Sequence, residues 1–183
     1  MTCTLCNSIL INKKDEYYYE CDTCKAIVKN KIYYLSADKE KERYESHNNN
    51  VDDIGYQNFT SPITNYVIQE FTSKHKGLDF GCGTGPVISS MLQKQNYNIT
   101  QYDPFFVPNK DVLKSTYDYI VSCEVFEHFY NPKEEIIRLI SLLKTEYCLS
   151  WQCSTMIKLT STHGFIEKTL LMFLSIEKKH LNI

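Results

Sequence analysis

The segment GLDFGCGTGPV, residues 77–87, decides the fold of this chain. Three glycines alternate along it, Gly81, Gly83 and Gly85, between a strand-like run and an apolar pattern with helical spacing. Glycines at a strand-to-helix turn let backbone N–H groups approach a ligand that any Cβ would push away. The dinucleotide fingerprint is G-x-G-x-x-G, and here Pro86 stands where its last glycine belongs. The loop therefore predicts a nucleotide-like ligand held by a turn that differs from the usual NAD turn.

The composition is that of an ordinary folded protein. The 183 residues are 43% hydrophobic and 23% charged, enough for one full domain and a small appendage. A net charge of −2 gives no strong signal for nucleic-acid binding. No apolar run reaches the ~20 residues that span a bilayer, and the first residues lack the features of a signal peptide. We therefore expect a cytoplasmic protein whose eight cysteines bind metal or are buried.

Four of these cysteines form two pairs near the N-terminus. Cys3-x2-Cys6 and Cys21-x2-Cys24 are separated by fourteen residues, a spacing typical of a zinc ribbon. Residues 13–15 read as a turn between two strands. Four thiolates leave no open position for water, so the Zn²⁺ would be structural and would supply much of the folding free energy. The alternative is four free cysteines in a frayed terminus.

A polar segment, residues 36–53, follows the cysteine pairs. A solvated helix is expected to begin after Ser36, a plausible cap, and to end at the run of asparagines 48–50. The composition favours a linker. The alternative is a lid over the cofactor or acceptor, in which Tyr44 and His47 take part.

Helix and strand patterns alternate through the rest of the core. We expect a helix at Ile63–Ser73 with Pro62 near its start, a helix at Val87–Gln95, a strand at Tyr97–Tyr102, a strand at Tyr117–Cys123 and a helix from Pro132. This order predicts an α/β fold, a doubly wound and mostly parallel sheet with helices on both faces.

Ligands bind such sheets at the carboxyl ends of the strands. The glycine loop, Asp103 and Glu124 all follow strands, so they converge on one crevice. Asp103 is placed to accept hydrogen bonds from ribose hydroxyls.

Three motifs in this order resemble class I S-adenosylmethionine-dependent methyltransferases. They read GLDFGCGTGP, then QYDP, then YDYIVSCEVFEHFYNPKEEIIRLISLLK, and they cover about residues 76–144. The cysteine pairs together with RYESHNN, residues 43–49, are similar to bacterial methyltransferase-domain proteins with an RYxxHNN segment. The resemblance implies a Rossmann-like fold and S-adenosylmethionine as cofactor, and it favours a lid or acceptor role for Tyr44 and His47. In this family the glycine-loop backbone holds the amino-acid part of the cofactor. The implied cofactor-binding residues are Asp79, Gly81, Cys82, Gly83, Gly85, Asp103, Glu124 and Val125. Among them, the resemblance implies that Asp79 supports the loop.

Methyl transfer requires few catalytic groups from the protein, because the sulfonium of the cofactor is already an activated methyl donor. Catalysis is then mostly positioning and exclusion of water. A general base is needed only when the acceptor must lose a proton, and Glu127 and His128 are the nearest candidates. Alternatively, Glu127 pairs at a helix start and His128 packs beside it. These motifs leave open whether the acceptor is a small molecule, a quinone precursor, a protein or RNA.

The tail, residues 145–183, departs from the family pattern. The family continues with a Pro-Gly-Gly turn and further strands, whereas this tail shows no such turn and no clear hairpin. Residues 156–182 can be reverse-translated with any synonymous codon and then read in a frame that starts at the third base of each codon. One translation that this shifted frame permits contains the string WFYRKDPTHVFFYRKETFEY. That string resembles the family pattern W-Y/F-Y-R-x-D-P-T-H-V-x-F-Y. Our hypothesis is an out-of-frame or truncated tail from about Thr145, which would leave the fold incomplete at its C-terminus and predicts weak cofactor binding.

The expected organisation is therefore a zinc ribbon at 1–35, a helical linker or lid at 36–75, a cofactor-binding core at 76–144 and the atypical tail at 145–183. A methyltransferase is the first hypothesis. The second is a non-catalytic zinc-ribbon module on a decayed methyltransferase fold, which binds a protein or nucleic acid through residues 1–35. A dehydrogenase comes third, because Pro86 and the Glu124–His128 motif argue against it.

Overall fold

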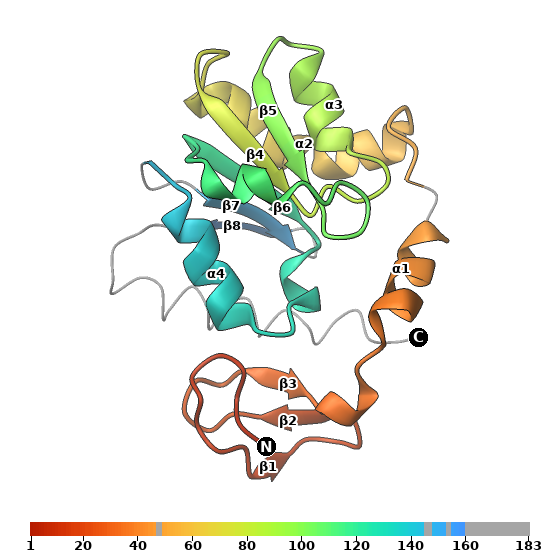
Figure 1. Ribbon diagram of the computed structural model, residues 1–183, viewed down its shortest axis with the longest axis vertical. Helices are drawn as coiled ribbons and strands as arrows, with labels where there is room; N and C mark the ends of the chain where they lie inside the picture. Colours follow the sequence, from red (N-terminus) through yellow and green to blue (C-terminus); the bar gives the residue numbers. More distant parts are fainter. Residues whose placement is uncertain (47–48, 145–147, 153–154, 160–183) are drawn as a thin grey trace.

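A computed structural model describes residues 1–46, 49–144, 148–152 and 155–159 of the chain. Figure 1 shows a small sheet at one end, the helix α1 (Ala37–Glu45) beside it, and a larger layered α/β unit above. The larger sheet has five strands in the order β5-β4-β6-β7-β8. Within these ranges, no helix has the length and hydropathy needed to cross a membrane.

The small sheet carries the N-terminal cysteines between and beside its strands. It consists of β1 (Asn12–Lys13), β2 (Tyr18–Glu20) and β3 (Ile27–Lys29), all antiparallel. The predicted turn connects β1 to β2, where Asp15 Oδ1 accepts hydrogen bonds from the N–H groups of Tyr17 and Tyr18 at 2.8 Å each. The third strand was not predicted, because two short strands and a turn already account for the sequence pattern.

Two helices connect the small sheet to the large one. The first, α1 (Ala37–Glu45), begins as predicted, and the Ser36 side chain accepts a hydrogen bond from the Lys39 N–H. A short 3-10 turn, η1 (Lys31–Tyr33), precedes it.

The second helix, α2 (Ile54–Glu70), corrects the prediction of Ile63–Ser73, because Pro62 lies inside it. A proline in a helix leaves the carbonyl four residues earlier without its usual donor. Here the Ser61 hydroxyl donates to that carbonyl, on Asn58, at 2.8 Å.

The large sheet is doubly wound, as predicted. The chain runs from the central β4 (Lys76–Phe80) to β5 (Asn98–Tyr102) on one side, and then returns to β6 (Tyr119–Cys123) on the other. These strands are parallel. The reversal places a topological switch point at the carboxyl end of β4, which is where such sheets bind ligands.

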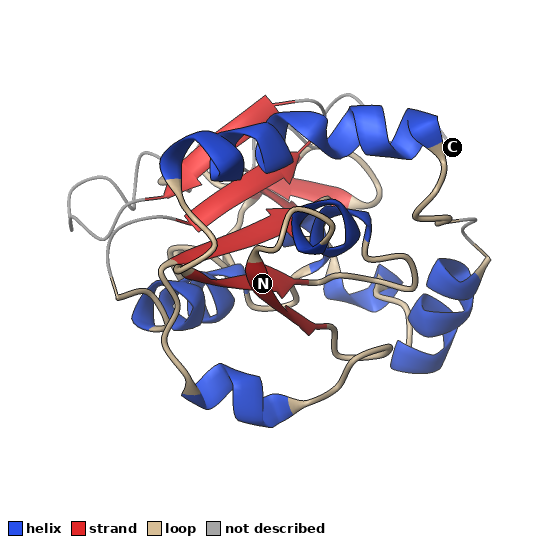
Figure 2. Cartoon of the chain, turned by 90° about the horizontal axis from the view of Figure 1, so that it is seen from above, coloured by secondary structure: helices blue, strands red, loops and turns tan. Residues whose placement is uncertain are grey.

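Helices cover both faces of this sheet, because successive residues of β6 pack against different helices. Tyr119 and Val121 are buried in a cluster with residues of α2 and α3 (Val87–Gln93), whereas Ile120 is buried in a cluster with α4 (Pro132–Ser141). Figure 2 shows the long helix α2 lying along one face of the strands. The first helix of the core, α3, ends at Gln93 rather than at the predicted Gln95.

The backbone of the tail forms a hairpin, contrary to the prediction. The strand β7 (Cys148–Gln152) pairs parallel with β6, and β8 (Thr155–Leu159) pairs antiparallel with β7. An unpaired edge of β6 would leave backbone N–H and C=O groups without partners, and β-branched, aromatic and aliphatic residues of the tail suit a strand. Residues 160–183 lie outside the described residues, and the reading-frame hypothesis stays a prediction.

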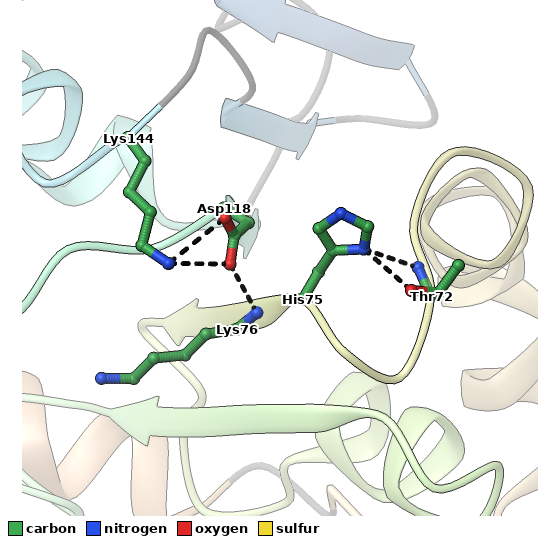
Figure 3. A network of polar contacts seen from close by, with 5 residues as sticks. All are labelled: Thr72, His75, Lys76, Asp118 and Lys144. Carbon is green, nitrogen blue, oxygen red and sulfur yellow. Dashed lines mark hydrogen bonds and ion pairs between the residues drawn. The ribbon is translucent and has the colours of Figure 1, made fainter.

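The amino ends of the strands are joined by one carboxylate, shown in Figure 3. Asp118 accepts a hydrogen bond from the backbone N–H of Lys76 at 2.8 Å and pairs with Lys144 Nζ at 3.1 Å. Nearby, His75 Nδ1 accepts a hydrogen bond from the N–H of Thr72 at 2.9 Å. These contacts hold β4, β6 and the chain after α4 together at the edge opposite the glycine loop, which leaves the carboxyl ends of the strands for a ligand.

Candidate functional site

A cavity of about 720 Å³ opens at the carboxyl ends of β4, β5 and β6. Its lining comes from the glycine loop, the turn after β5, the turn after β6, the start of α4 and one side of α1. A volume of this size is in the range of small-molecule sites. Gly81, Cys82, Gly83, Asp103, Glu124, Val125, Glu127, His128 and Tyr44 all line it, so the topology brings together most of the predicted site residues. His47 lies outside the described residues.

The glycine loop is shaped by what packs against it. Gly81 has φ +78° and Gly83 has φ +63°, a region that other residues rarely adopt. A Cβ on Gly81 would also lie 2.5 Å from Cγ2 of Val125, so the turn after β6 lies directly against this loop. Glycine at position 81 is therefore required both by conformation and by contact.

The first N–H groups of the loop bind the protein itself. Those of Gly81 and Cys82 donate to the Tyr102 carbonyl at 2.8 and 3.2 Å, and that of Gly83 donates to Asp103 Oδ2 at 3.0 Å. The end of β5 therefore takes the hydrogen bonds of these three N–H groups. The role of the loop backbone in cofactor binding stays a prediction. Thr84 also lines the cavity, whereas Gly85 does not.

Asp103 has a wider role in the fold than the sequence indicates. Besides Gly83, it accepts hydrogen bonds at Oδ1 from the N–H groups of Phe105 at 2.8 Å and Phe106 at 3.1 Å. A carboxylate offers about four acceptor positions, so three backbone donors leave about one for a ribose hydroxyl. The predicted ribose contact is thus compatible with the geometry, on a side chain that is already held rigid.

Asp79 lies beneath the loop, on β4, and only 3% of it is exposed. The Ser89 hydroxyl donates to its Oδ2 at 2.7 Å, which ties β4 to the first turn of α3. Burial raises the pKa of Asp79, the hydrogen bonds from Ser89 lower it, and the nearby Asp103 raises it, with a net value of about 6. Its position is consistent with support of the loop, the role that the family resemblance implies.

The turn after β6 is strained. Glu124 has φ +52°, in the left-handed region that costs free energy for a residue with a Cβ. Cys123 precedes it, and burial raises the pKa of the Cys123 thiol, as it does for Cys82 across the cavity. Both thiols are therefore neutral near pH 7. Cys82 is buried, as expected, whereas Cys123 is half-buried.

The opposite wall of the cavity is aromatic and acidic. The Tyr44 ring meets the His128 ring edge to face, with centroids 5.4 Å apart, and lies 6.1 Å from the Phe105 ring. The Tyr44 hydroxyl donates to Glu40 Oε1 at 3.2 Å. Burial raises the pKa of Tyr44, and the carboxylate of Glu40 adds to this. Tyr44 thus stays a neutral hydrogen-bonding group across the physiological pH range.

The two candidate bases adjoin one another in η3 (Phe126–His128). Glu127 Oε1 lies 3.7 Å from His128 Nε2, and the two side chains are 25% and 42% exposed. Both reach the cavity, so a proton could pass from an acceptor to either group. The alternative prediction, pairing of Glu127 beside His128, describes the same contact.

Sequence analysis missed several lining residues, among them Asn49, Tyr56, Phe106 and Tyr130. Tyr130 donates through its hydroxyl to Glu40 Oε2 at 2.7 Å and to the Leu35 carbonyl at 3.2 Å, which anchors the start of α1 to the core. Such contacts span some ninety residues of sequence and leave no local pattern. Asn49 could have been found, because it belongs to the RYxxHNN segment.

The four N-terminal cysteines meet in one cluster. Their Sγ atoms all lie within 4.8 Å of one another, with Cys3–Cys24 at 3.6 Å and Cys6–Cys21 at 3.5 Å. Ligands at 2.3 Å in a tetrahedron around Zn²⁺ would be about 3.8 Å apart, so the donor set fits this ion.

The two cysteine pairs have the same backbone fold. The N–H of Cys3 donates to the Ser8 carbonyl and that of Cys21 to the Ala26 carbonyl, both at 2.8 Å. Asn7 and Lys25, each directly after the second cysteine of its pair, have φ +63° and +60°.

The buried carboxyl of Asp79 predicts a pH-dependent stability. A pKa raised to about 6 in the fold means that its contribution is fully present below pH 4 and is lost as the pH rises through 6. Relative to Asp79→Asn, the wild type should lose about 1 kcal/mol of unfolding free energy between pH 5 and pH 7.5. Urea unfolding at both pH values measures this.

Asp118→Asn is the matched control. Partial burial of Asp118 opposes ionisation, but hydrogen bonds from the Lys76 N–H and Lys144 lower its pKa overall. Its carboxyl is therefore ionised in both states above pH 5, and the stability difference from wild type should not change in this window. The same pH dependence for Asp79→Asn as for wild type would contradict a raised pKa for Asp79.

One family model matches more than half of the chain. Residues 51–150, more than half of the chain, match the family described as methyltransferase domain. Among solved structures, the plantazolicin methyltransferase BpumL in complex with SAH is 20% identical, with a TM-score of 0.35, and the match covers 63% of this chain and 54% of that one. A second BpumL structure, with a pentazolic desmethylPZN analog and SAH, is 18% identical, with a TM-score of 0.38 and coverages of 74% and 63%. No curated protein matches the chain. On the match over residues 51–150, the chain belongs to the methyltransferase domain family, with the Rossmann-like fold of class I.

Proposed function

We propose that this protein binds S-adenosylmethionine in the cavity at the carboxyl ends of β4, β5 and β6 and transfers its methyl group to an acceptor. The observation that carries the proposal is the meeting of the glycine loop, Asp103 and Glu124 in one cavity, at the switch point of a methyltransferase-family sheet. When bound, the cofactor supplies a methyl group already activated on a sulfonium.

The residues of the cavity suit the parts of this cofactor. Asp103 keeps about one acceptor position for a ribose hydroxyl. In dinucleotide folds the glycine turn holds the group attached to the ribose 5′ carbon, and in S-adenosylmethionine that group is the methionine part. This part would therefore lie at the glycine loop, with Glu124 and Val125 beside it.

The acceptor would then bind beside the ring pair of Tyr44 and His128. The rings of Tyr44, Phe105 and His128 exclude water from this side of the cavity, which favours an in-line displacement. Glu127 or His128 would take the proton of an acceptor that must lose one. The chemistry of the acceptor is left to experiment.

Saturable binding of S-adenosylhomocysteine to the full chain is the first expected outcome, with a Kd below about 1 mM by calorimetry. Gly81→Ala should weaken binding by at least about tenfold, because a Cβ there strains the backbone and displaces Val125. The control is Asn58→Ala, on the exposed surface of α2, which should bind as the wild type does.

A folded sample that binds no S-adenosylhomocysteine would contradict the proposal. It would favour the alternative of a non-catalytic module that binds a protein or nucleic acid through residues 1–35.

Glu127→Gln tests the base. Once radiolabelled S-adenosylmethionine has identified an acceptor, this variant should lower the transfer rate roughly 10²- to 10⁴-fold while S-adenosylhomocysteine binds as before. Glu135→Gln is the matched control, because Glu135 also lines the cavity but pairs with Arg138 at 3.2 Å. Equal rates for Glu127→Gln and wild type would remove Glu127 as the base.

We also propose that the four clustered thiolates bind one structural Zn²⁺. Metal analysis of the purified chain should find about one zinc per molecule, and Cys6→Ser should reduce it while Cys82→Ser should not. Removing the metal with a chelator should collapse the NMR signals of residues 1–35, because a segment this small buries too little apolar surface to fold alone. Unchanged signals in a metal-free sample would refute a structural metal.

A further inference from the structure

The third glycine of the loop, Gly85, is explained by a contact from another part of the chain. Its φ is not positive, unlike those of Gly81 and Gly83, so its conformation does not require glycine. A Cβ at this position would lie 1.8 Å from the Asn49 carbonyl oxygen and 2.8 Å from the Asn49 Cβ. The backbone at Asn49 therefore crosses directly over Gly85, at a distance that only glycine permits.

The crossing segment, residues 49–53, is held in place by α2. Asn50 Oδ1 accepts from the Asp52 N–H at 3.0 Å, and the Asn50 carbonyl accepts from the Asp53 N–H at 3.0 Å. Gln57 Nε2 donates to the Val51 carbonyl at 2.7 Å. Asp53 caps α2 by accepting from the Tyr56 N–H at 2.7 Å. A chain tied down in this way can position a side chain over the loop.

The Asn49 side chain is the group so positioned. Asn49 lines the cavity, and its Nδ2 lies 3.9 Å from where a Cβ on Gly83 would be. The amide is thus over the turn from Gly83 to Gly85. It offers both a donor and an acceptor, which match the carboxylate and the ammonium of an α-amino acid. The loop itself offers few N–H groups here, because those of Gly81, Cys82 and Gly83 are bonded to the end of β5.

We propose that Asn49 is a cofactor-binding residue that contacts the α-amino-acid part of S-adenosylmethionine, and that Gly85 is a positioning residue that lets Asn49 reach it. This inference rests on the proposed cofactor. It assigns to residues 49–53, between α1 and α2, a share of the binding site that the glycine loop does not provide.

Two ligands separate a direct contact from a structural effect. S-adenosylhomocysteine carries the amino-acid part, whereas 5′-methylthioadenosine lacks it. Asn49→Ala should weaken S-adenosylhomocysteine binding by about tenfold or more, the usual effect of losing a hydrogen bond to a charged group, and should leave 5′-methylthioadenosine unchanged. Asn58→Ala, the same change on the exposed surface of α2, should alter neither.

A double-variant cycle tests the role of Gly85. Gly85→Ala should weaken S-adenosylhomocysteine binding at least as much as Asn49→Ala, because the added methyl group displaces Asn49. The double variant should bind no more weakly than Gly85→Ala alone, since a displaced Asn49 has no contact left to lose. Additive losses would overturn the positioning role of Gly85.

The outcomes distinguish this inference from the proposed function. If the wild type binds neither ligand, the proposed cofactor is wrong. If the wild type binds both and Asn49→Ala binds S-adenosylhomocysteine as tightly, or loses affinity for both ligands equally, the cofactor stands and the Asn49 contact is refuted.

Discussion

The docking of the glycine loop onto the end of β5 is the interaction on which the site depends. Gly81 and Cys82 donate to the Tyr102 carbonyl, and Gly83 donates to Asp103, so the loop is bonded to the neighbouring strand. The same carboxylate of Asp103 holds the following turn at Phe105 and Phe106. Hydrogen bonds to a carboxylate are stronger than those to neutral acceptors, so this side chain fixes two walls of the cavity at once.

The N-terminal ribbon takes part in the architecture of the site. Its buried residues, such as Leu5, Leu10 and Val28, belong to the same apolar cluster as Phe80 and Phe126 of the methyltransferase core. Burial of these groups from both units is favourable in proportion to the apolar area removed from water. The chain leaves the ribbon into α1, which contributes Tyr44 to the aromatic wall of the cavity. A metal that orders the ribbon would therefore also influence the acceptor side of the site.

Local sequence patterns correctly predicted the elements whose formation depends on residues close in the chain. The strands and helices that flank the glycine loop and the strand ending at Cys123 occur where periodicity predicts them, within a few residues. The start of α2 was missed, because Pro62 reads as a boundary until Ser61 is seen to satisfy the Asn58 carbonyl. The hairpin of β7 and β8 was missed because its pairing is set by the open edge of β6, a partner distant in sequence.

The sequence by itself determined the fold class and the convergence of the glycine loop, Asp103 and Glu124, because strand ends of a parallel sheet meet at one edge. It also determined the pairing of the cysteines into one cluster, since spacing constrains how two tight turns can meet. Only the tertiary structure decided what each group does there. It showed that Asp103 accepts a hydrogen bond from the Gly83 N–H, that Tyr130 anchors α1, and that Asn49 crosses Gly85. Contacts of this kind depend on the packing of segments far apart in the chain, and no local pattern encodes them.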